Sequence, residues 1–459
     1  MVTSKVYYLP KGTEPTDEVV NNLISSTQRE KNMQNYEALY GYYMSMPVTE
    51  RPAPHDIRVV VGHARYITKI NVGYLLGNPV QYLASEGVDI EPLDLLYRNQ
   101  TISTLDVELA TDASIFGHAF ERVYTDKEGN SRSAKIDPRN IILAYDDTVE
   151  HNKLFAIIYT QSYRADGTEI KGQYECTILT DTMIKERVLK NKTLVASDDD
   201  EDIEHSYGEV PVIEYVNSSD RMGDFEPVVS LIDAYNILQS DRVIDRERLV
   251  DAFLMVSGAS FTPEQQKALK EGRIVSGIPA DAEMKYIIKN INEADADVLR
   301  ETLMADIHKI SMTPDMSDKN FLGNSSGVAL LFKLLPFEDH IKDKERYFEN
   351  GLMDRFRMYN RILAAIGKMQ IVKPADIDAT FKRALPQNDL EISQMINNLV
   401  GIVDRETLVS RLSFVQDAKE TVELANKEDD EDLELGNYGT DKPDNHSEDH
   451  KTSTFEDKE

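Results

Sequence analysis

The chain has 459 residues, of which 41% are hydrophobic and 29% charged, and these are the values of a globular protein with room for a sizeable core. Its 81 Asp and Glu residues outnumber its 51 Lys and Arg residues, which leaves a formal net charge of -30. Tight binding of duplex DNA needs a strongly positive surface, so this charge argues against it. The charge is compatible with a protein past which DNA slides, because a negative wall offers phosphates nothing to stick to.

The sequence contains one cysteine, Cys176, which excludes an intrachain disulfide and fits a reducing compartment. We interpret it as a small strand side chain rather than a reactive thiol. Residues 1–12 lack the apolar core of a signal peptide, and no run approaches the roughly 20 apolar residues that span a bilayer. We therefore expect no membrane partner, and a protein made and used in the cytoplasm or in an assembly built there.

The first part of the chain is predicted to be helical. Apolar residues recur at helical spacing over 18–46, 58–77 and 102–116, and a proline-rich bend at 52–54 separates the first two helices. Four tyrosines gather along the first helix, and we interpret them as core or subunit packing, because they lack the flanking Lys and Arg of a base-stacking platform. These are Tyr36, Tyr40, Tyr42 and Tyr43.

From 119 to 215 the pattern changes to short alternating runs separated by turn signals, which predicts a mostly antiparallel β region. The acidic run at 198–202 is interpreted as a solvated hairpin tip.

Two long helices around an insert are predicted after Phe225. Apolar residues recur as far as Leu254, which indicates a helix of about 29 residues, or roughly 43 Å. Its other face carries both signs of charge, which suits packing beside copies of itself, although a coiled coil or a surface helix gives the same pattern. An insert at 259–293 is expected to hold a short polar helix at 263–272 and a strand at 285–289. The returning helix is predicted from Leu299 to Ile310.

A third long helix is predicted over 326–368, with Pro336 inside it. Proline removes a backbone donor and clashes with the preceding turn, so the helix must kink there.

The segment Gly323-Asn324-Ser325-Ser326-Gly327 matches the nucleophile elbow of serine hydrolases letter for letter. That elbow needs an apolar strand before the serine, and none precedes Ser325, so we favour a polar loop whose serines cap the next helix. The scattered histidines, the single cysteine and the absence of a phosphate-binding loop give no metal, cofactor or ATP site. We expect no catalytic residue, no metal, no cofactor and no enzyme activity.

Several blocks of the chain together resemble the portal proteins, or head-tail connectors, of tailed double-stranded DNA bacteriophages, in the branch typical of phages of Gram-positive hosts. The resemblance covers roughly 33–367, and its blocks are the tyrosine-rich helix, 64–67, 72–80, 210–215, 231–236 and, most specifically, 314–316 with 321–330. It implies an α+β, elongated, multi-lobed subunit with a β-rich wing, long stem helices, an α/β clip insert, a kinked helix and an α-helical crown.

The resemblance also implies an order of parts along the chain. It gives an N-terminal arm (1–27), a wing (28–225), stem helix 1 (226–258), the clip (259–292), stem helix 2 (293–314), a tunnel loop (315–325), the kinked wing helix (326–368), a return strand (369–389) and the crown (390–427). The tail at 428–459 lies beyond the resemblance, and with thirteen Asp or Glu residues and few apolar ones it is predicted to be disordered.

Two of these parts would carry the function. The tunnel loop would face DNA, and its residues are Asp315, Met316, Ser317, Asp318, Lys319, Asn320, Phe321, Leu322, Gly323, Asn324 and Ser325. The clip would dock the terminase and later the head-tail adaptor, through Phe261, Gln265, Lys267, Lys270, Glu271, Arg273 and Tyr286.

The resemblance implies a dodecameric ring at one capsid vertex, the channel for DNA packaging and ejection. Its partners would be further copies of this chain, the terminase large subunit, the adaptor, the major capsid and scaffold proteins, and double-stranded DNA that passes without sequence readout. The protein would reside in the virion, and in the host cytoplasm during assembly. Two alternatives remain: a non-portal ring or scaffold subunit, and a serine hydrolase that uses Ser325.

Overall fold

The computed structural model describes residues 4–46, 57–127, 129–196, 202–250, 253–257, 262–264, 267, 283–287, 293–317, 327–383, 389–410, 412, 415, 418–419 and 421–427. The chain divides into two units, Met1–Ala384 and Leu385–Glu459. Helices and open sheets are mixed along the chain, so the expected α+β class is confirmed.

The largest sheet of the first unit has seven strands in the order β1-β5-β6-β7-β8-β10, with β9 also paired to β8. Its pairs are antiparallel except for β1, which runs parallel to β5 with Tyr7 opposite Ala144. Side chains of helix α1 (Asp17–Ile24) pack on this sheet with Phe155 and Ile157. The strands are β1 (Tyr7–Leu9), β5 (Ile141–Asp146), β6 (Lys153–Tyr163), β7 (Glu169–Leu179), β8 (Met183–Lys190), β9 (Thr193–Ala196) and β10 (Ile203–Glu204).

The sheet confirms the predicted antiparallel region and adds an N-terminal strand that local patterns did not reveal. The sequence sets 1–27 apart as an arm, whereas β1 is an edge strand of the sheet and Val20 and Leu23 lie in its core. Cys176 is a buried residue of β7, and burial raises the pKa of its thiol to about 11, as expected of an unreactive strand residue.

Two smaller sheets complete this region. A three-stranded sheet has the order β11-β3-β4, and a two-stranded ribbon joins β14 to β2. Their strands are β3 (His118–Thr125), β4 (Ser131–Ile136), β11 (Val212–Val216), β2 (Gln81–Ala84) and β14 (Ile377–Thr380), and the short 3-10 turns are Pro138–Asn140, Glu226–Val228 and Pro374–Asp376.

The early helices are α1, α2 (Thr27–Tyr43), α3 (His63–Leu76), α4 (Glu91–Asn99) and α5 (Ile102–Phe116). The predicted first helix is two helices, because Ser25 ends the first and Ser26 caps the second by accepting a hydrogen bond from the Arg29 amide. The second helix begins at His63, five residues later than predicted, and α4 was not predicted. The proline-rich bend at 52–54 lies outside the described residues. Tyr36 and Tyr42 are buried in one core with α3, α5 and the start of α6, as expected for packing tyrosines.

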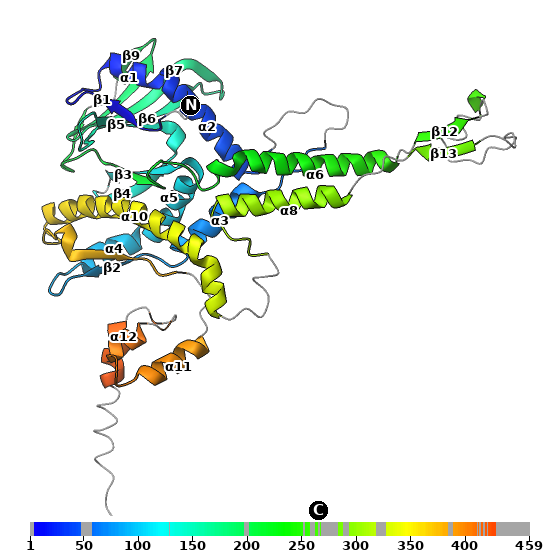
Figure 1. Ribbon diagram of the computed structural model, residues 1–459. Coiled ribbons are helices and arrows are strands. Elements are labelled where there is room, and N and C mark those ends of the chain that lie inside the picture. The colour runs from blue at the N-terminus through cyan, green and yellow to red at the C-terminus, as the bar shows by residue number, and fades with distance from the viewer. Residues whose placement is uncertain are drawn as a thin grey trace, which may run out of the picture. The chain divides into compact units, whose positions relative to one another are not determined.

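Helices α6 (Val229–Val250) and α8 (Glu293–Ile310) lie side by side (Figure 1). The prediction that the first of them extends to Leu254 is wrong. Phe253–Ser257 is strand β12, paired antiparallel with β13 (Glu283–Ile287), because this apolar run finds a partner strand in the insert. The predicted strand at 285–289 is thus confirmed with a shift of two residues, and of the polar helix at 263–272 only 263–264 and 267 are described, all helical.

Helix α10 (Gly327–Ala365) contains Pro336, and Figure 1 shows that this helix changes direction along its N-terminal part. The second unit holds α11 (Asp389–Leu399) and α12 (Arg405–Val409), where Asp404 caps α12 by accepting from the Thr407 amide. The acidic tail at 428–459 lies outside the described residues. In the part of the chain that the structure describes, no helix combines the length and hydropathy that a bilayer crossing needs.

Candidate functional site

The root of the α6/α8 pair is tied to the early helices by polar contacts. The Tyr42 hydroxyl donates to Asp233 at 2.7 Å, and the backbone amide of Val61 donates to Asn236 at 2.9 Å. Farther along, Arg242 of α6 forms a 3.0 Å salt bridge with Asp297 of α8. The pair is therefore anchored at one end and braced along its length.

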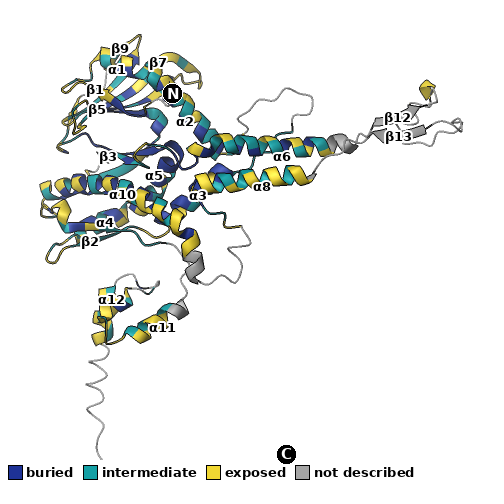
Figure 2. Cartoon of the chain, viewed as in Figure 1, coloured by how far each residue is buried: buried dark blue, intermediate teal, exposed yellow. Residues whose placement is uncertain are grey.

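Helix α8 buries little of its apolar surface within its own chain. Among residues 294–310, whose burial the structure describes, Ile307 alone is buried. Val298, Leu299 and Ile310 remain 63%, 50% and 49% exposed, and Figure 2 shows exposed residues along the helix. Between them, the partly buried Leu303 and Met304 pack with Ile307 against the core of the first unit.

The predicted tunnel loop is described only at its start. Asp315 accepts hydrogen bonds from the Ser317 amide and hydroxyl, at 2.9 and 2.6 Å, and Met316 donates its amide to the Tyr66 hydroxyl. The remaining predicted loop residues lie outside the described residues: Asp318, Lys319, Asn320, Phe321, Leu322, Gly323, Asn324 and Ser325.

A histidine pair lies beside this start of the loop. The rings of His63 and His308 are 6.1 Å apart, and His308 contacts the Thr313 carbonyl through Nδ1 at 3.0 Å. Burial and then the neighbouring His308 lower the pKa of His63 to about 4, and Asp315 opposes that shift only in part. His63 is therefore neutral at physiological pH.

Helix α10 follows the loop. Pro336 has no N–H, so the Phe332 carbonyl lacks its usual donor four residues on. Phe332 is 72% and Leu335 50% exposed, whereas Leu334 and Phe337, one on either side of the proline, are buried. The helix therefore keeps one buried face on both sides of Pro336.

The predicted clip residues are described in part. Lys267 is an exposed helical residue, and Tyr286 lies on β13 opposite Leu254 of β12. Phe261, Gln265, Lys270, Glu271 and Arg273 lie outside the described residues.

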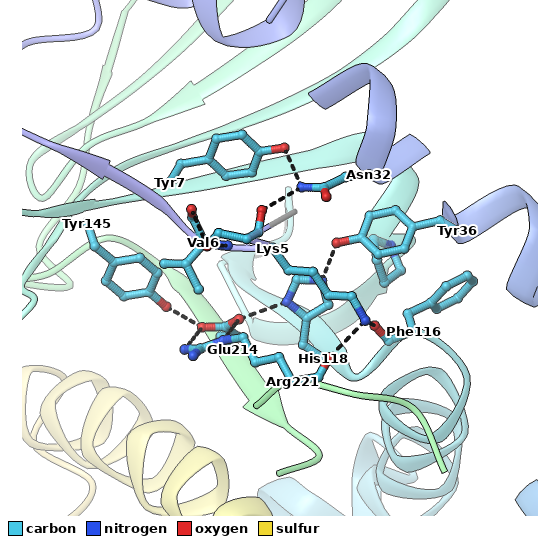
Figure 3. A network of polar contacts seen from close by, with 12 residues as sticks. Lys5, Val6, Tyr7, Asn32, Tyr36, Phe116, His118, Tyr145, Glu214 and Arg221 are labelled. Carbon is cyan, nitrogen blue, oxygen red and sulfur yellow. Dashed lines mark hydrogen bonds and ion pairs between the residues drawn. The ribbon is translucent and has the colours of Figure 1, made fainter. Parts of the chain in front are cut away.

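A second polar cluster lies between helix α2 and strands β3, β5 and β11 (Figure 3). Glu214 accepts from Tyr145 at 2.6 Å, from Arg221 at 3.2 Å and from His118 at 2.8 Å, and the other ring nitrogen of His118 meets the Tyr36 hydroxyl. Burial alone would raise the pKa of Glu214, but the His118 hydrogen bond and the Arg221 charge hold it well below its usual range. The His118 and Glu214 side chains are only 3% and 6% exposed, and the polar groups of the cluster satisfy one another. The cluster therefore joins elements and is a poor candidate for catalysis.

The described residues give no catalytic arrangement that supports the serine hydrolase alternative. Ser325 lies outside the described residues, as do His446 and His450. His340, the described histidine downstream, faces Asp224 at 3.7 Å from within α10. Among the described residues, no group of three or more His, Cys, Asp or Glu side chains is placed to hold a metal ion.

Comparison with known proteins shows which protein family the sequence matches. Residues 24–435 match the family described as phage portal protein, SPP1 Gp6-like. The portal protein of Bacillus phage SPP1 is 25% identical over 384 residues, which cover 78% of this chain and 73% of that protein. The portal protein of Clostridium phage phiCD119 is 24% identical over 230 residues, covering 48% of this chain and 49% of that protein.

Proposed function

The chain belongs to the SPP1 Gp6-like family of phage portal proteins, and from this premise we propose that twelve copies form a ring at one capsid vertex. This ring would be the channel through which DNA is packaged and later ejected. The family is structural, and we propose accordingly that the chain is not an enzyme.

The proposal of a ring rests on one observation, which is the apolar surface of α6 and α8 that this chain leaves exposed. Val298 and Leu299 on α8, and Ile237 and Val243 on α6, are at least 38% exposed, and the Tyr42–Asp233 hydrogen bond anchors this helix pair to the core at one end. Identical copies packed around a closed axis would bury such a surface on every subunit at once. Most of the stability of an amphipathic helix comes from such packing.

The charge supports passage of DNA without capture. Exposed acids such as Asp295 and Glu301 occur on α8, and Asp315 opens the proposed tunnel loop. Lys319 is the one cation among the eleven proposed loop residues. Repulsion between these carboxylates and phosphates is screened over about 8 Å at physiological salt, so DNA would be kept from sticking without being excluded.

The remaining parts are proposed by their order along the chain. Residues 259–292 fall between the stem helices and would form the clip, where the terminase large subunit and then the head-tail adaptor dock. The β12/β13 ribbon, with Tyr286 on it, would give the clip its frame. Residues 390–427 would form the crown, and capsid and scaffold proteins would contact the ring during assembly in the host cytoplasm.

The test shortens the proposed loop. Removing residues 321–325 is expected to leave procapsids intact and to abolish DNA packaging in infected cells. The matched control removes five residues from the acidic segment at 197–201, and packaging is expected to continue. If the variant without 321–325 still packages DNA, the tunnel-loop assignment is wrong. If that variant forms no procapsids while the control does, a scaffold role is favoured.

A further inference from the structure

Helix α3 holds the chain just after α8 through two side chains. The Tyr66 hydroxyl donates to the Pro314 carbonyl at 3.1 Å and accepts from the Met316 amide at 2.8 Å. One turn and a half further along the helix, Asn71 donates to the Thr313 hydroxyl at 2.8 Å, and both of these side chains are buried. Three residues of the four at 313–316 are therefore bound to α3.

The same helix holds α10 just past its proline. The Tyr74 hydroxyl donates to Glu338, two residues beyond Pro336, at 2.6 Å. The Tyr74 ring also packs against Phe337, with 4.8 Å between the ring centroids. Helix α3 thus contacts α10 at the first two residues past the proline.

A third segment closes on this junction. Arg383, from the last residues of the first unit, binds Glu338 at 3.2 Å and Glu345 at 2.6 Å, and its guanidinium lies 5.7 Å from the Tyr74 ring centre. Asn78, two residues past the end of α3, donates to the carbonyls of Lys382 and Arg383. The chain that leaves the first unit is fixed to the same two helices.

From these contacts we infer that α3 is a bracket that sets the end of α8 against α10, with Tyr66 and Tyr74 as its positioning residues. Eight residues separate the two tyrosines, which places their contacts about 12 Å apart along one helix. This inference rests on the proposed function in one respect: the loop proposed to face DNA, 315–325, begins at the first point that α3 holds and precedes the second in the chain.

A positioning role differs from general stabilisation in which segments of the chain change when the contact is lost. Each tyrosine makes its polar contact through the hydroxyl alone, so a change to Phe keeps the ring packing and removes the bond. Tyr42 offers a matched control, because it is 9% exposed against 8% for Tyr74 and its hydroxyl also donates to a carboxylate, that of Asp233.

The experiment measures amide hydrogen exchange along the full-length assembled protein in the variants Tyr66→Phe, Tyr74→Phe and Tyr42→Phe. Losing one hydrogen bond of about 1 kcal/mol is expected to speed local opening by roughly five- to tenfold. In Tyr66→Phe the rise is expected at 313–317, and in Tyr74→Phe at 337–341 and 381–383. The control is expected to leave all three segments unchanged and to raise exchange near 233.

DNA packaging is measured on the same variants. Tyr66→Phe and Tyr74→Phe are expected to slow packaging while procapsid numbers hold. Exchange that stays at the wild-type level in both α3 variants, or that rises equally in the control, would overturn the bracket. If exchange responds as expected while the chain lacking 321–325 still packages DNA, the bracket stands and the DNA-facing assignment fails.

Discussion

Arg355 on α10 and Asp106 on α5 form a buried salt bridge of 2.6 Å, although 249 residues separate them along the chain. The same guanidinium reaches Glu121 of β3 at 2.8 Å, and all three side chains are at most 5% exposed. This triad ties the long helix to the helix and strand that form the centre of the first unit.

Replacing Arg355 with Leu is expected to lower the free energy of unfolding by about 3–5 kcal/mol, because two carboxylates lose their buried partner. Denaturant unfolding measures the loss. The matched control is Arg357→Leu, whose side chain is 45% exposed and pairs with Asp354 on the same helix. That exposed pair is expected to contribute under about 1 kcal/mol, and equal losses in the two variants would contradict the assignment.

Replacing Lys5 with Met tests whether the N-terminal residues are part of the fold. The Lys5 ammonium donates to the carbonyls of Phe116 and Arg221 and to Glu226, at 2.8 to 3.0 Å. Leaving these acceptors unpaired is expected to cost about 3 kcal/mol. Thermal unfolding is the measurement, and Lys11→Met, at an exposed position, is the control. No difference between the two would show that the N-terminal segment is dispensable.

His63 predicts how stability responds to acid. Its pKa is lowered to about 4 in the folded chain, from 6.5 when unfolded, first by burial and then by His308. Between these values the unfolded chain binds a proton that the folded chain does not, so stability falls as pH drops from 6.5 to 4 and then levels off. Replacing His63 with Leu is expected to flatten this part of the profile. Taking the difference between variant and wild type cancels the other titrating groups, and parallel profiles would exclude the effect.

Replacing Leu299 with Glu tests the proposed subunit interface. A carboxylate in the apolar surface of α8 would be desolvated on assembly, so rings are expected to dissociate while the melting of the single chain changes little. Mass photometry over a range of concentrations reports the ring fraction. Val149→Glu makes the same kind of change at a residue that is 98% exposed, and rings of that variant are expected to persist. Intact rings of Leu299→Glu would place the interface elsewhere.

The sequence predicted those elements whose limits are set locally. Helix α5 has the predicted bounds, because Gly117 ends it with a φ of 85° in a place where a Cβ would lie 1.8 Å from the Arg221 carbonyl oxygen. The residues at 253–257 were wrongly predicted to continue the helix, because a short apolar stretch is compatible with helix or strand until its partner is known. Strand β1 pairs with residues more than 130 positions away, which no local pattern reveals.

Some residues of the candidate site could likewise be predicted from the sequence, and others could not. Pro336 follows from the sequence alone, since a helix-interior proline acts through its own backbone, whereas Asp315 was expected only from the resemblance to portal proteins. Tyr66 and Tyr74 look like ordinary apolar-face residues of a helix, and their hydroxyl contacts to Pro314 and Glu338 exist only after packing. Long-range polar contacts of this kind were therefore missed.

The most direct test of the account is the mass and shape of the purified full-length protein, by mass photometry and negative-stain imaging. Twelve copies of a 52.1 kDa chain amount to about 0.6 MDa, and the account predicts a closed ring of that order with a central hole. A particle that stays a monomer or dimer across the accessible concentrations, or an open filament in place of a ring, would contradict it.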